Sequence, residues 1–201
     1  MIAIFDYGAG NLRSVENTLD AVGATYDIVN DSAGLERADK IILPGVGHFG
    51  QLLRSLDELG VRNTLKDRMA AGVPFLGICL GLQALFEDSE EAPELKGLGV
   101  FPGRVVRFPE NLTVPQMGWN KLQLKGEPKL LAGLGEAPYV YFANSYYVPV
   151  ETAGERAAAA CDYGGVGLTA ALESGNIFGV QFHPEKSSAV GQKIVTNFLA
   201  C

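Results

Sequence analysis

The first half of the chain alternates short apolar runs with segments in which apolar residues recur every three or four positions. The short runs predict buried strands at residues 2–5, 26–29, 73–79 and from Lys40 onward. The wider spacings predict helices that present Leu12, Val15, Leu19 and Val22, then Phe49, Leu52, Leu53, Leu56 and Leu59, then Val61, Leu65 and Met69. Strands that alternate with helices in this way are typical of a parallel sheet with helices on its faces.

The pattern of apolar and polar residues changes from about Gly99 onward. Short strand-like segments separated by glycine and proline follow one another there, namely GRVVRF, NKLQL, YVYF, SYYVPV, GLTAAL and IFGVQF. A closing helix is expected at 188–199, with Ser187 or Ser188 as its N-cap. We therefore predict one three-layer α/β domain over residues 1–201. Its central, largely parallel sheet is extended by mixed or antiparallel strands of the C-terminal half, unless these form a small second sheet.

Composition narrows the classes of function. No apolar stretch approaches the roughly 20 residues that span a bilayer, and the chain starts without a basic or cleavable leader, so we expect a cytoplasmic protein that does not bind membranes. Three cysteines at scattered positions fit neither a disulfide framework nor a metal site, and no cofactor is expected. The formal net charge is −7 and there is no basic cluster, which argues against nucleic acid as a partner.

The strongest chemical signal is the segment Gly77-Ile78-Cys79-Leu80-Gly81, between a predicted strand and a helix expected at 80–86. It has the form of a nucleophile elbow, a sharp turn in which the positions two before and two after the nucleophile are small because backbones crowd there. The start of the helix would place partial positive charge beside the sulfur and aim the Leu80 amide at an oxyanion. The alternative is a buried cysteine that packs as a small hydrophobic residue.

A cysteine nucleophile needs a base, and the chain has two histidines, His48 and His183. His183 directly follows an apolar strand. Glu185, two positions later, projects to the same side of an extended chain, where its carboxylate can bind the second N–H of the ring. A surface histidine before a proline turn would give the same pattern. His48 is expected to be a loop residue that faces solvent, so His183 is the predicted base and Glu185 the residue that orients it.

The loop Pro44-Gly45-Val46-Gly47 follows the third predicted strand. Open parallel sheets bind ligands at the carboxyl ends of their strands, and the glycines beside Val46 allow the backbone to turn an amide toward a ligand. The loop is therefore a candidate for the second oxyanion donor. An ordinary turn between a strand and a helix would also favour glycine.

These segments together resemble a known family. GICLGLQ, with HPE downstream and PGVG upstream, resembles the class I, triad-type glutamine amidotransferases. A closer resemblance, to the glutaminase subunits of imidazole glycerol phosphate synthases of histidine biosynthesis, rests on DYGAGNLRSV, LPGVGHFG, ALFEDSEE, VPQMGWN, YFANSYY and GVQFHPEKSS. The matching segments extend from Asp6 to Ser188 and so cover nearly the whole chain.

The resemblance implies that Cys79 attacks the side-chain amide of glutamine, that His183 carries the proton to the leaving ammonia, and that Glu185 orients His183. It implies that the oxyanion and the substrate are bound by Val46, Gly47, Leu80, Gln83 and Glu91 and by the backbone of Ser145, Tyr146 and Tyr147. The implied partner is a (β/α)8-barrel cyclase subunit, which takes the ammonia and forms imidazole glycerol phosphate and an aminoimidazole carboxamide ribotide. The residues expected at that interface are Asn11, Trp119 and Lys186.

One position departs from the family pattern, and other functions stay open. Asn144 stands in YFANSYY where members often carry histidine, which weakens the idea that a histidine is required there. The nearest alternative is a glutaminase subunit for anthranilate, aminodeoxychorismate or pyridoxal phosphate synthesis, which QMGWN and HPEKSS disfavour. The others are a stand-alone cysteine peptidase or γ-glutamyl hydrolase, and a binding module that has lost activity.

Overall fold

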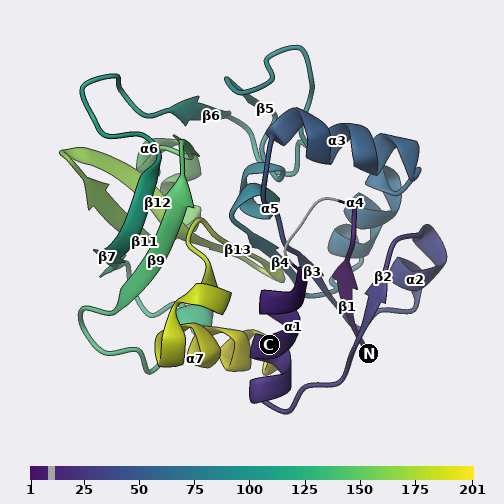
Figure 1. Cartoon of the computed structure of the whole chain (residues 1–201). Coiled ribbons are helices and arrows are strands. Elements are labelled where there is room, and N and C mark those ends of the chain that lie inside the picture. Colours follow the sequence, from purple (N-terminus) through teal and green to yellow (C-terminus); the bar gives the residue numbers. More distant parts are fainter. Residues whose placement is uncertain (9–11) are drawn as a thin grey trace.

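The computed structural model describes residues 1–8 and 12–201. Its centre is an eight-stranded sheet with the order β2-β1-β3-β4-β13-β12-β11-β8 (Figure 1). The parallel part consists of β2 (Tyr26–Val29), β1 (Ile2–Phe5), β3 (Lys40–Leu43), β4 (Phe75–Ile78) and β13 (Ile177–Val180). The antiparallel extension consists of β12 (Val166–Ser174), β11 (Ala157–Tyr163) and β8 (Gln123–Leu124). The predicted parallel sheet with antiparallel additions is confirmed.

The position of β13 brings the segment that carries His183 next to Cys79. Although β13 lies near the end of the chain, it inserts between β4 and β12 and runs parallel to β4, with Val180 opposite Ile78. The Cys79 amide then donates to the Val180 carbonyl over 2.7 Å. Because neighbouring parallel strands end at the same edge of a sheet, the segment after β13 emerges beside Cys79.

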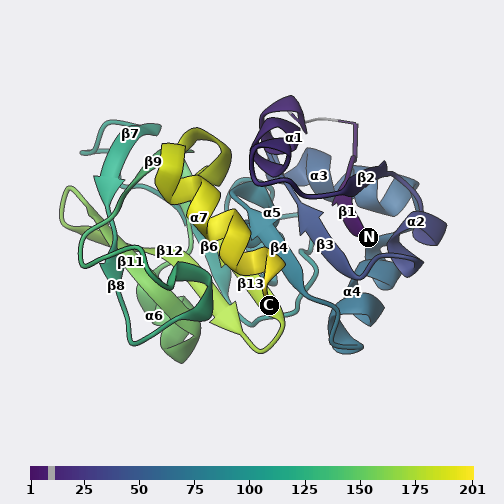
Figure 2. The same ribbon diagram turned by 90° about the horizontal axis from the view of Figure 1, so that it is seen from below.

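Helices cover both faces of the sheet (Figures 1 and 2). One face carries α2 (Ser32–Glu36), α3 (Phe49–Glu58) and α4 (Arg62–Ala70), and the other carries α1 (Leu12–Ala21) and α7 (Ser188–Leu199). Phe5 packs in the first of the two cores and Ile4 in the second, because successive side chains of a strand point to opposite faces. The three layers expected from the sequence are therefore present.

Two small sheets lie beside the main one. The first joins β10 (Tyr146–Tyr147), β6 (Arg104–Arg107) and β5 (Asp88–Ser89). The second pairs β7 (Gln116–Lys121) with β9 (Tyr139–Asn144) and lies next to α7 in Figure 1. The remaining helical segments are α5 (Leu80–Gln83), α6 (Val150–Ala153) and the 3-10 turns Lys129–Leu131, Gly154–Arg156 and Pro184–Lys186. Strands of the C-terminal half thus both extend the main sheet and form separate sheets.

Three local predictions differ from the structure. The helix expected at 80–86 ends at Gln83. The Ala84 carbonyl accepts from the Leu98 amide, and the Leu85 carbonyl accepts from the amides of Val100 and Phe101, so these carbonyls do not continue the helix. The strand β11 was not predicted, since its run of alanines favours a helix when taken alone. Ser187 occupies the N-cap position of α7 but makes no side-chain cap there, because its hydroxyl donates to the His183 carbonyl instead.

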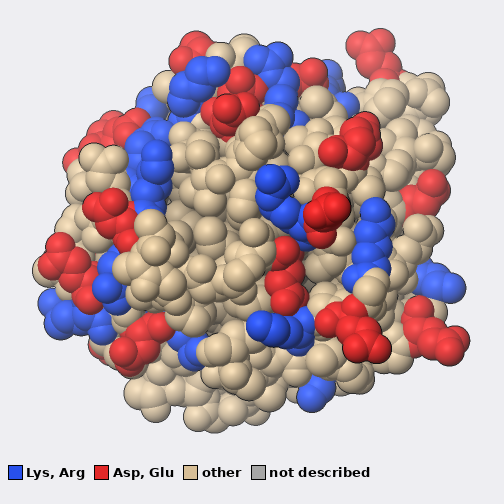
Figure 3. Space-filling view, turned by 180° about the vertical axis from the view of Figure 1, so that it is seen from behind, with Lys and Arg blue, Asp and Glu red and all other residues tan. Residues whose placement is uncertain are grey.

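On the face seen in Figure 3, Lys and Arg are interspersed with Asp and Glu rather than gathered into a basic patch. Within residues 1–8 and 12–201, no helix is both long and apolar enough to cross a membrane.

Candidate active site

Cys79 lies at a strained turn between β4 and α5. Its backbone has φ 53° and ψ −105°, a left-handed conformation that a non-glycine residue rarely adopts. The turn needs glycine on both sides: a Cβ on Gly77 would lie 2.5 Å from the Gly81 carbonyl oxygen, and a Cβ on Gly81 would lie 2.0 Å from that of Leu43. The Cys79 side chain is buried, and Leu80, as the first residue of α5, has an amide without an acceptor inside the helix. This is the elbow geometry that the spacing of the two glycines predicts.

His183 lies just beyond β13 and is only 3% exposed. Its Nδ1 lies 2.7 Å from Oε1 of Glu185, so the predicted pairing of these two side chains is present. Burial opposes a charge on the ring, but the neighbouring Cys79 sulfur and the Glu185 carboxylate outweigh this effect and raise the pKa of His183 to about 10. Because Nδ1 binds Glu185, Nε2 is the ring atom left for proton transfer at the sulfur.

The backbone around His183 is fixed by a short network. The His183 amide donates to the Tyr141 carbonyl over 2.8 Å, and the Ser187 hydroxyl donates to the His183 carbonyl over 2.7 Å. The same hydroxyl accepts from the Tyr141 amide at 3.0 Å. Strand β9 therefore holds the turn that carries His183 and Glu185.

Gln181 is a site residue that the sequence prediction missed. It is fully buried, and its Nε2 lies 3.5 Å from Sγ of Cys79. Its Oε1 accepts from Nε2 of Gln83, which also donates to the Tyr146 carbonyl. The sequence carried a signal for it, since Gln181 precedes His183 by two positions and so projects to the same side, by the argument that selected Glu185.

A cavity of about 290 Å³ opens beside Cys79. Of the residues predicted to act on the substrate, it is lined by Val46, Gly47, Cys79, Leu80, Gln83, Glu91, Ser145, Tyr146 and His183. Glu185 binds the far side of the His183 ring, and Tyr147 is buried and stacks on Phe108 rather than lining the cavity. Asn144 and Lys186 line it as well.

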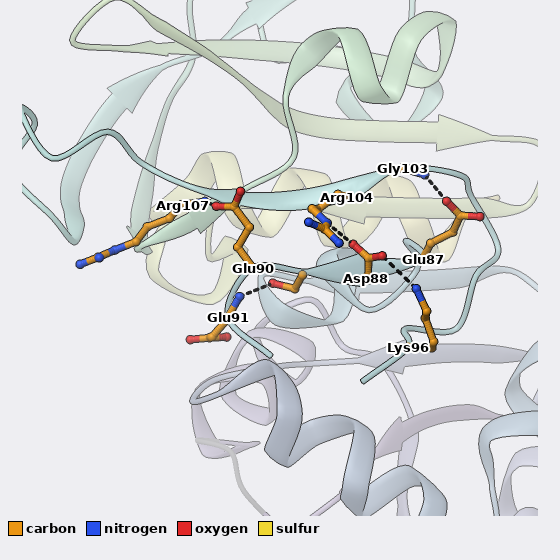
Figure 4. A network of polar contacts seen from close by, with 9 residues as sticks. Glu87, Asp88, Glu90, Glu91, Lys96, Gly103, Arg104 and Arg107 are labelled. Carbon is orange, nitrogen blue, oxygen red and sulfur yellow. Dashed lines mark hydrogen bonds and ion pairs between the residues drawn. The ribbon is translucent and has the colours of Figure 1, made fainter. Parts of the chain in front are cut away.

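Glu91 follows β5, beside a network of ion pairs on the small sheet of β5 and β6, and its backbone amide donates to the Ser89 hydroxyl over 3.2 Å (Figure 4). Asp88 forms ion pairs with Arg104 and Lys96, and the Arg104 guanidinium in particular holds the pKa of Asp88 below its usual range. One oxygen of Glu91 accepts from the Phe49 amide at 2.7 Å, at the start of α3. Glu91 therefore faces the cavity while also capping a helix.

The loop 44–47 has a different arrangement from the one that an oxyanion role needs. The Val46 amide donates to the Tyr7 hydroxyl over 3.0 Å, and the same hydroxyl donates to the Val46 carbonyl over 2.9 Å. The predicted second oxyanion donor is therefore bound to Tyr7 in this conformation. His48 is exposed as expected, and its Nδ1 accepts from the Gly50 amide as the N-cap of α3.

Two of the residues predicted at an interface, Trp119 and Lys186, lie against the ring of Tyr141. Trp119 is 48% exposed and contacts the Tyr141 ring edge to face, with centroids 6.1 Å apart. Nζ of Lys186 lies 5.8 Å from the centroid of the same ring. Asn11 falls outside the described residues.

Asn144 has a structural partner of its own. It is 6% exposed, and its Nδ2 donates to the Tyr146 carbonyl over 3.0 Å, beside the bond from Gln83 to that carbonyl. Its amide thus helps to fix the cavity wall at Tyr146.

Comparison with known proteins places the chain in a family. The family model for class I glutamine amidotransferases matches residues 3–201. The imidazole glycerol phosphate synthase subunit HisH of Methanothermobacter thermautotrophicus is 48% identical over 199 residues, which cover 99% of this chain and 98% of that protein. The subunit HisH of Trichodesmium erythraeum is 48% identical over 202 residues, covering 99% and 94%.

A solved structure agrees in fold. The crystal structure of a glutamine amidotransferase superposes with a TM-score of 0.77 at 20% identity, covering 99% of this chain and 97% of that chain. The chain belongs to the class I glutamine amidotransferases, within the family of HisH subunits of imidazole glycerol phosphate synthase.

Proposed function

We propose that this chain is the glutaminase subunit of an imidazole glycerol phosphate synthase in histidine biosynthesis, and that it hydrolyses glutamine to glutamate and ammonia. The observation that carries the proposal is the set of Cys79, His183 and Glu185 around one cavity, with Glu185 bonded to the ring of His183. The family membership of the chain supports the pathway. We also propose that residues 1–201 act as one domain and work in the cytoplasm.

The first half-reaction uses Cys79 as the nucleophile. The sulfur attacks the amide carbon of the glutamine side chain, and the carbonyl oxygen becomes an oxyanion. The C–N bond then breaks while His183 gives its proton to the leaving nitrogen, which departs as ammonia. Glu185 supports the imidazolium and keeps Nδ1 protonated, as the orienting carboxylate does in a catalytic triad.

The second half-reaction returns the enzyme to its starting state. Water attacks the thioester carbon while His183 accepts a proton, the C–S bond breaks, and glutamate leaves. The Leu80 amide at the start of α5 is one oxyanion donor in both halves. The second donor is assigned to the 44–47 loop and requires the Val46 amide to leave Tyr7.

Substrate recognition is proposed for the polar wall of the cavity. The Glu91 carboxylate is the natural partner for the ammonium group of glutamine. The Gln83 amide nitrogen already donates to Tyr146 and Gln181, so we expect Gln83 to contact the substrate through its oxygen. Ser145 and Tyr146 complete this wall through their backbone.

The partner is proposed to be the cyclase subunit, docked over the β7–β9 sheet. Three large apolar side chains on this sheet are well exposed, with fractions of 65% for Met117, 48% for Trp119 and 54% for Tyr139. Trp119 and Met117 lie on the same side of β7, because they are two positions apart. This apolar surface adjoins Lys186 and the cavity mouth, which would let ammonia pass directly to the partner.

A thiol-directed analogue of glutamine tests the chemistry. After incubation with the purified chain, peptide mass spectrometry should find the label on Cys79 and not on Cys161 or Cys201. Excess glutamine should protect Cys79. A chain that stays unlabelled in the presence of the cyclase would overturn the proposal and favour a binding module without activity.

A further inference from the structure

Two parts of the cavity wall are attached to the same small sheet. Strand β6 pairs with β5 on one side and with β10 on the other. The chain runs from β5 directly to Glu91, and β10 contains Tyr146, and both of these residues line the cavity. The pairing of β5 and β10 with β6 therefore determines how far Glu91 lies from Tyr146.

This distance matters for a substrate that is an α-amino acid. The ammonium group of such a substrate needs an anionic partner, for which Glu91 is proposed, and its carboxylate needs N–H donors. The ammonium and carboxylate groups are bonded to one carbon atom, so their spacing is fixed. Partners in the protein can bind both groups together only when their own spacing matches.

Glu91 takes its position from the end of β5. Its amide donates to the hydroxyl of Ser89, which is fully buried, and the Glu90 amide donates to the Val105 carbonyl of β6 over 2.9 Å. One oxygen of the Glu91 carboxylate accepts from the Phe49 amide. The other oxygen has no partner among the described residues and is left for the substrate. A shift of β5 relative to β6 would therefore move the Glu91 carboxylate.

Asp88 strengthens the short contact between β5 and β6. The two strands are paired at only two positions, and one of these joins Asp88 to Arg104. The Asp88 carboxylate forms an ion pair with the Arg104 guanidinium through one oxygen and with the Lys96 ammonium, at 3.1 Å, through the other (Figure 4). Asp88 is only 9% exposed, although both cations are more open to solvent. A ladder of two residue pairs has few other contacts to keep it in place when this ion pair is lost.

We propose that Asp88 is a positioning residue for substrate recognition. Its ion pair with Arg104 holds β5 on β6 and so places the Glu91 carboxylate at the distance from Tyr146 that the charged head group of glutamine requires. This inference rests on the proposed glutaminase function and concerns recognition of its substrate. The nucleophile and its base follow β4 and β13, which belong to the main sheet. Loss of the ion pair should therefore raise KM for glutamine and leave kcat unchanged.

A substrate without the α-amino group provides the sharpest probe. The compound 5-amino-5-oxopentanoate keeps the carboxylate and the side-chain amide of glutamine but has no ammonium group for Glu91. The ratio of its KM to the KM of glutamine measures what recognition of the ammonium contributes. If the analogue does not turn over, its inhibition constant against glutamine replaces its KM. The chain is assayed in complex with the cyclase and its nucleotide ligand.

The test compares Asp88→Asn with Asp57→Asn. Asp88→Asn should raise the KM of glutamine about fivefold, a factor at the upper end for ion pairs with exposed partners, while kcat and the constant of the analogue stay unchanged. Arg104→Met removes the same ion pair from β6 and should act alike, and the double variant should add little. Asp57→Asn removes a carboxylate that pairs with Arg62, and neither of these residues lines the cavity. It should behave as wild type.

Other outcomes separate the positioning role from the proposed function. An equal rise for glutamine and the analogue in Asp88→Asn would show a general loosening of the cavity and overturn the role of Asp88. An unchanged KM for glutamine would overturn it too, and so would equal binding of the two compounds by the wild-type chain. These results leave the glutaminase assignment standing. A wild-type complex that releases no glutamate overturns the glutaminase function itself.

Thermal unfolding shows whether each variant is folded. If Asp88→Asn does not fold, Arg104→Met decides the question alone, since it leaves Asp88 paired with Lys96. A wild-type KM for glutamine in a folded Arg104→Met chain then overturns the inference.

Discussion

The wall of the cavity that carries His183 and the wall formed by residues 44–47 are held in different ways. On the first, the backbone of His183 binds Tyr141 and the Ser187 hydroxyl, and its ring binds Glu185. On the second, the described residues provide the loop backbone with one partner, the Tyr7 hydroxyl.

This difference suggests separate roles for the two walls, with proton transfer on the His183 wall and control of the rate in the 44–47 loop. Groups for proton transfer that are fixed before the substrate arrives need no rearrangement during the reaction. A loop held by one side chain can change its conformation at a small cost in free energy. Changes in the His183 wall should therefore abolish turnover, whereas the loop should set how far the partner stimulates it.

The nucleophile should show the largest effect. Cys79→Ser should lower glutamine-dependent synthesis by the complex about 1,000-fold or more, while synthesis from added ammonia continues because the cyclase is unchanged. Cys201→Ser replaces the same atoms at an exposed site and should have no effect. Cys161 should not matter either, since burial raises the pKa of its thiol to about 11. Equal loss of both activities in Cys79→Ser would show disrupted assembly instead.

The two partners of the triad should then differ from each other. His183→Ala removes the proton carrier and should approach the loss in Cys79→Ser. Glu185→Gln keeps the shape but loses the charge, and its loss in kcat should be smaller by about tenfold or more. Equal losses would give Glu185 a more direct role in the reaction.

An NMR titration checks the same pair without turnover. The ring of His183 should keep its proton at pH values well above the usual histidine pKa, because the Cys79 sulfur and the Glu185 carboxylate outweigh the effect of burial. Glu185→Gln should shift that pKa downward. His48→Asn simplifies the spectrum and retains an N-cap acceptor for α3. An unchanged pKa in Glu185→Gln would contradict the electrostatic role of the carboxylate.

Gln181 should have an intermediate effect. Gln181→Leu removes the donor to the Cys79 sulfur and leaves one N–H of Gln83 without its acceptor. We expect kcat to fall about tenfold, in line with the loss of one or two buried hydrogen bonds. Thermal unfolding and ammonia-dependent synthesis serve as controls. A wild-type kcat would show that the contact with sulfur does not assist the reaction.

Asn144 should have the smallest effect. Its amide fixes the Tyr146 carbonyl, and Gln83 binds the same carbonyl, so the wall keeps one donor when Asn144 changes. Asn144→His should change the rate less than about tenfold, which corresponds to about 1.4 kcal/mol. Rates of glutamate release check this, and a larger change would place the position in the chemistry.

The sequence predicts the parts of the site whose signals are local. Cys79 is found because glycine lies two positions before it and two positions after it, where close backbone contacts leave no room for a side chain. Glu185 is found because it lies two positions from His183, although the chain there is a 3-10 turn, Pro184–Lys186, and not the extended segment that the prediction assumed. The strands 2–5 and 26–29 and the helix 188–199 appear at the predicted bounds, since their apolar patterns match one kind of element.

The missed features depend on contacts between distant segments. The insertion of β13 beside β4 follows from packing of the whole sheet and not from the pattern of either strand. The bond between Tyr7 and Val46 joins residues that two helices and two strands separate, so no local pattern marks it. The alanine-rich β11 is a strand because its small side chains are buried between neighbours, which overrides their helical propensity.

Glutamate release under three conditions tests the central claim, that fixed chemistry on one wall is controlled through the loop on the other. The chain is assayed alone, with the cyclase, and with the cyclase and its nucleotide ligand bound. The account predicts slow release by the free chain and an acceleration of about tenfold or more with the loaded partner, which needs only about 1.4 kcal/mol of coupling. Equal rates in all three conditions would contradict control through the loop and leave the triad in place.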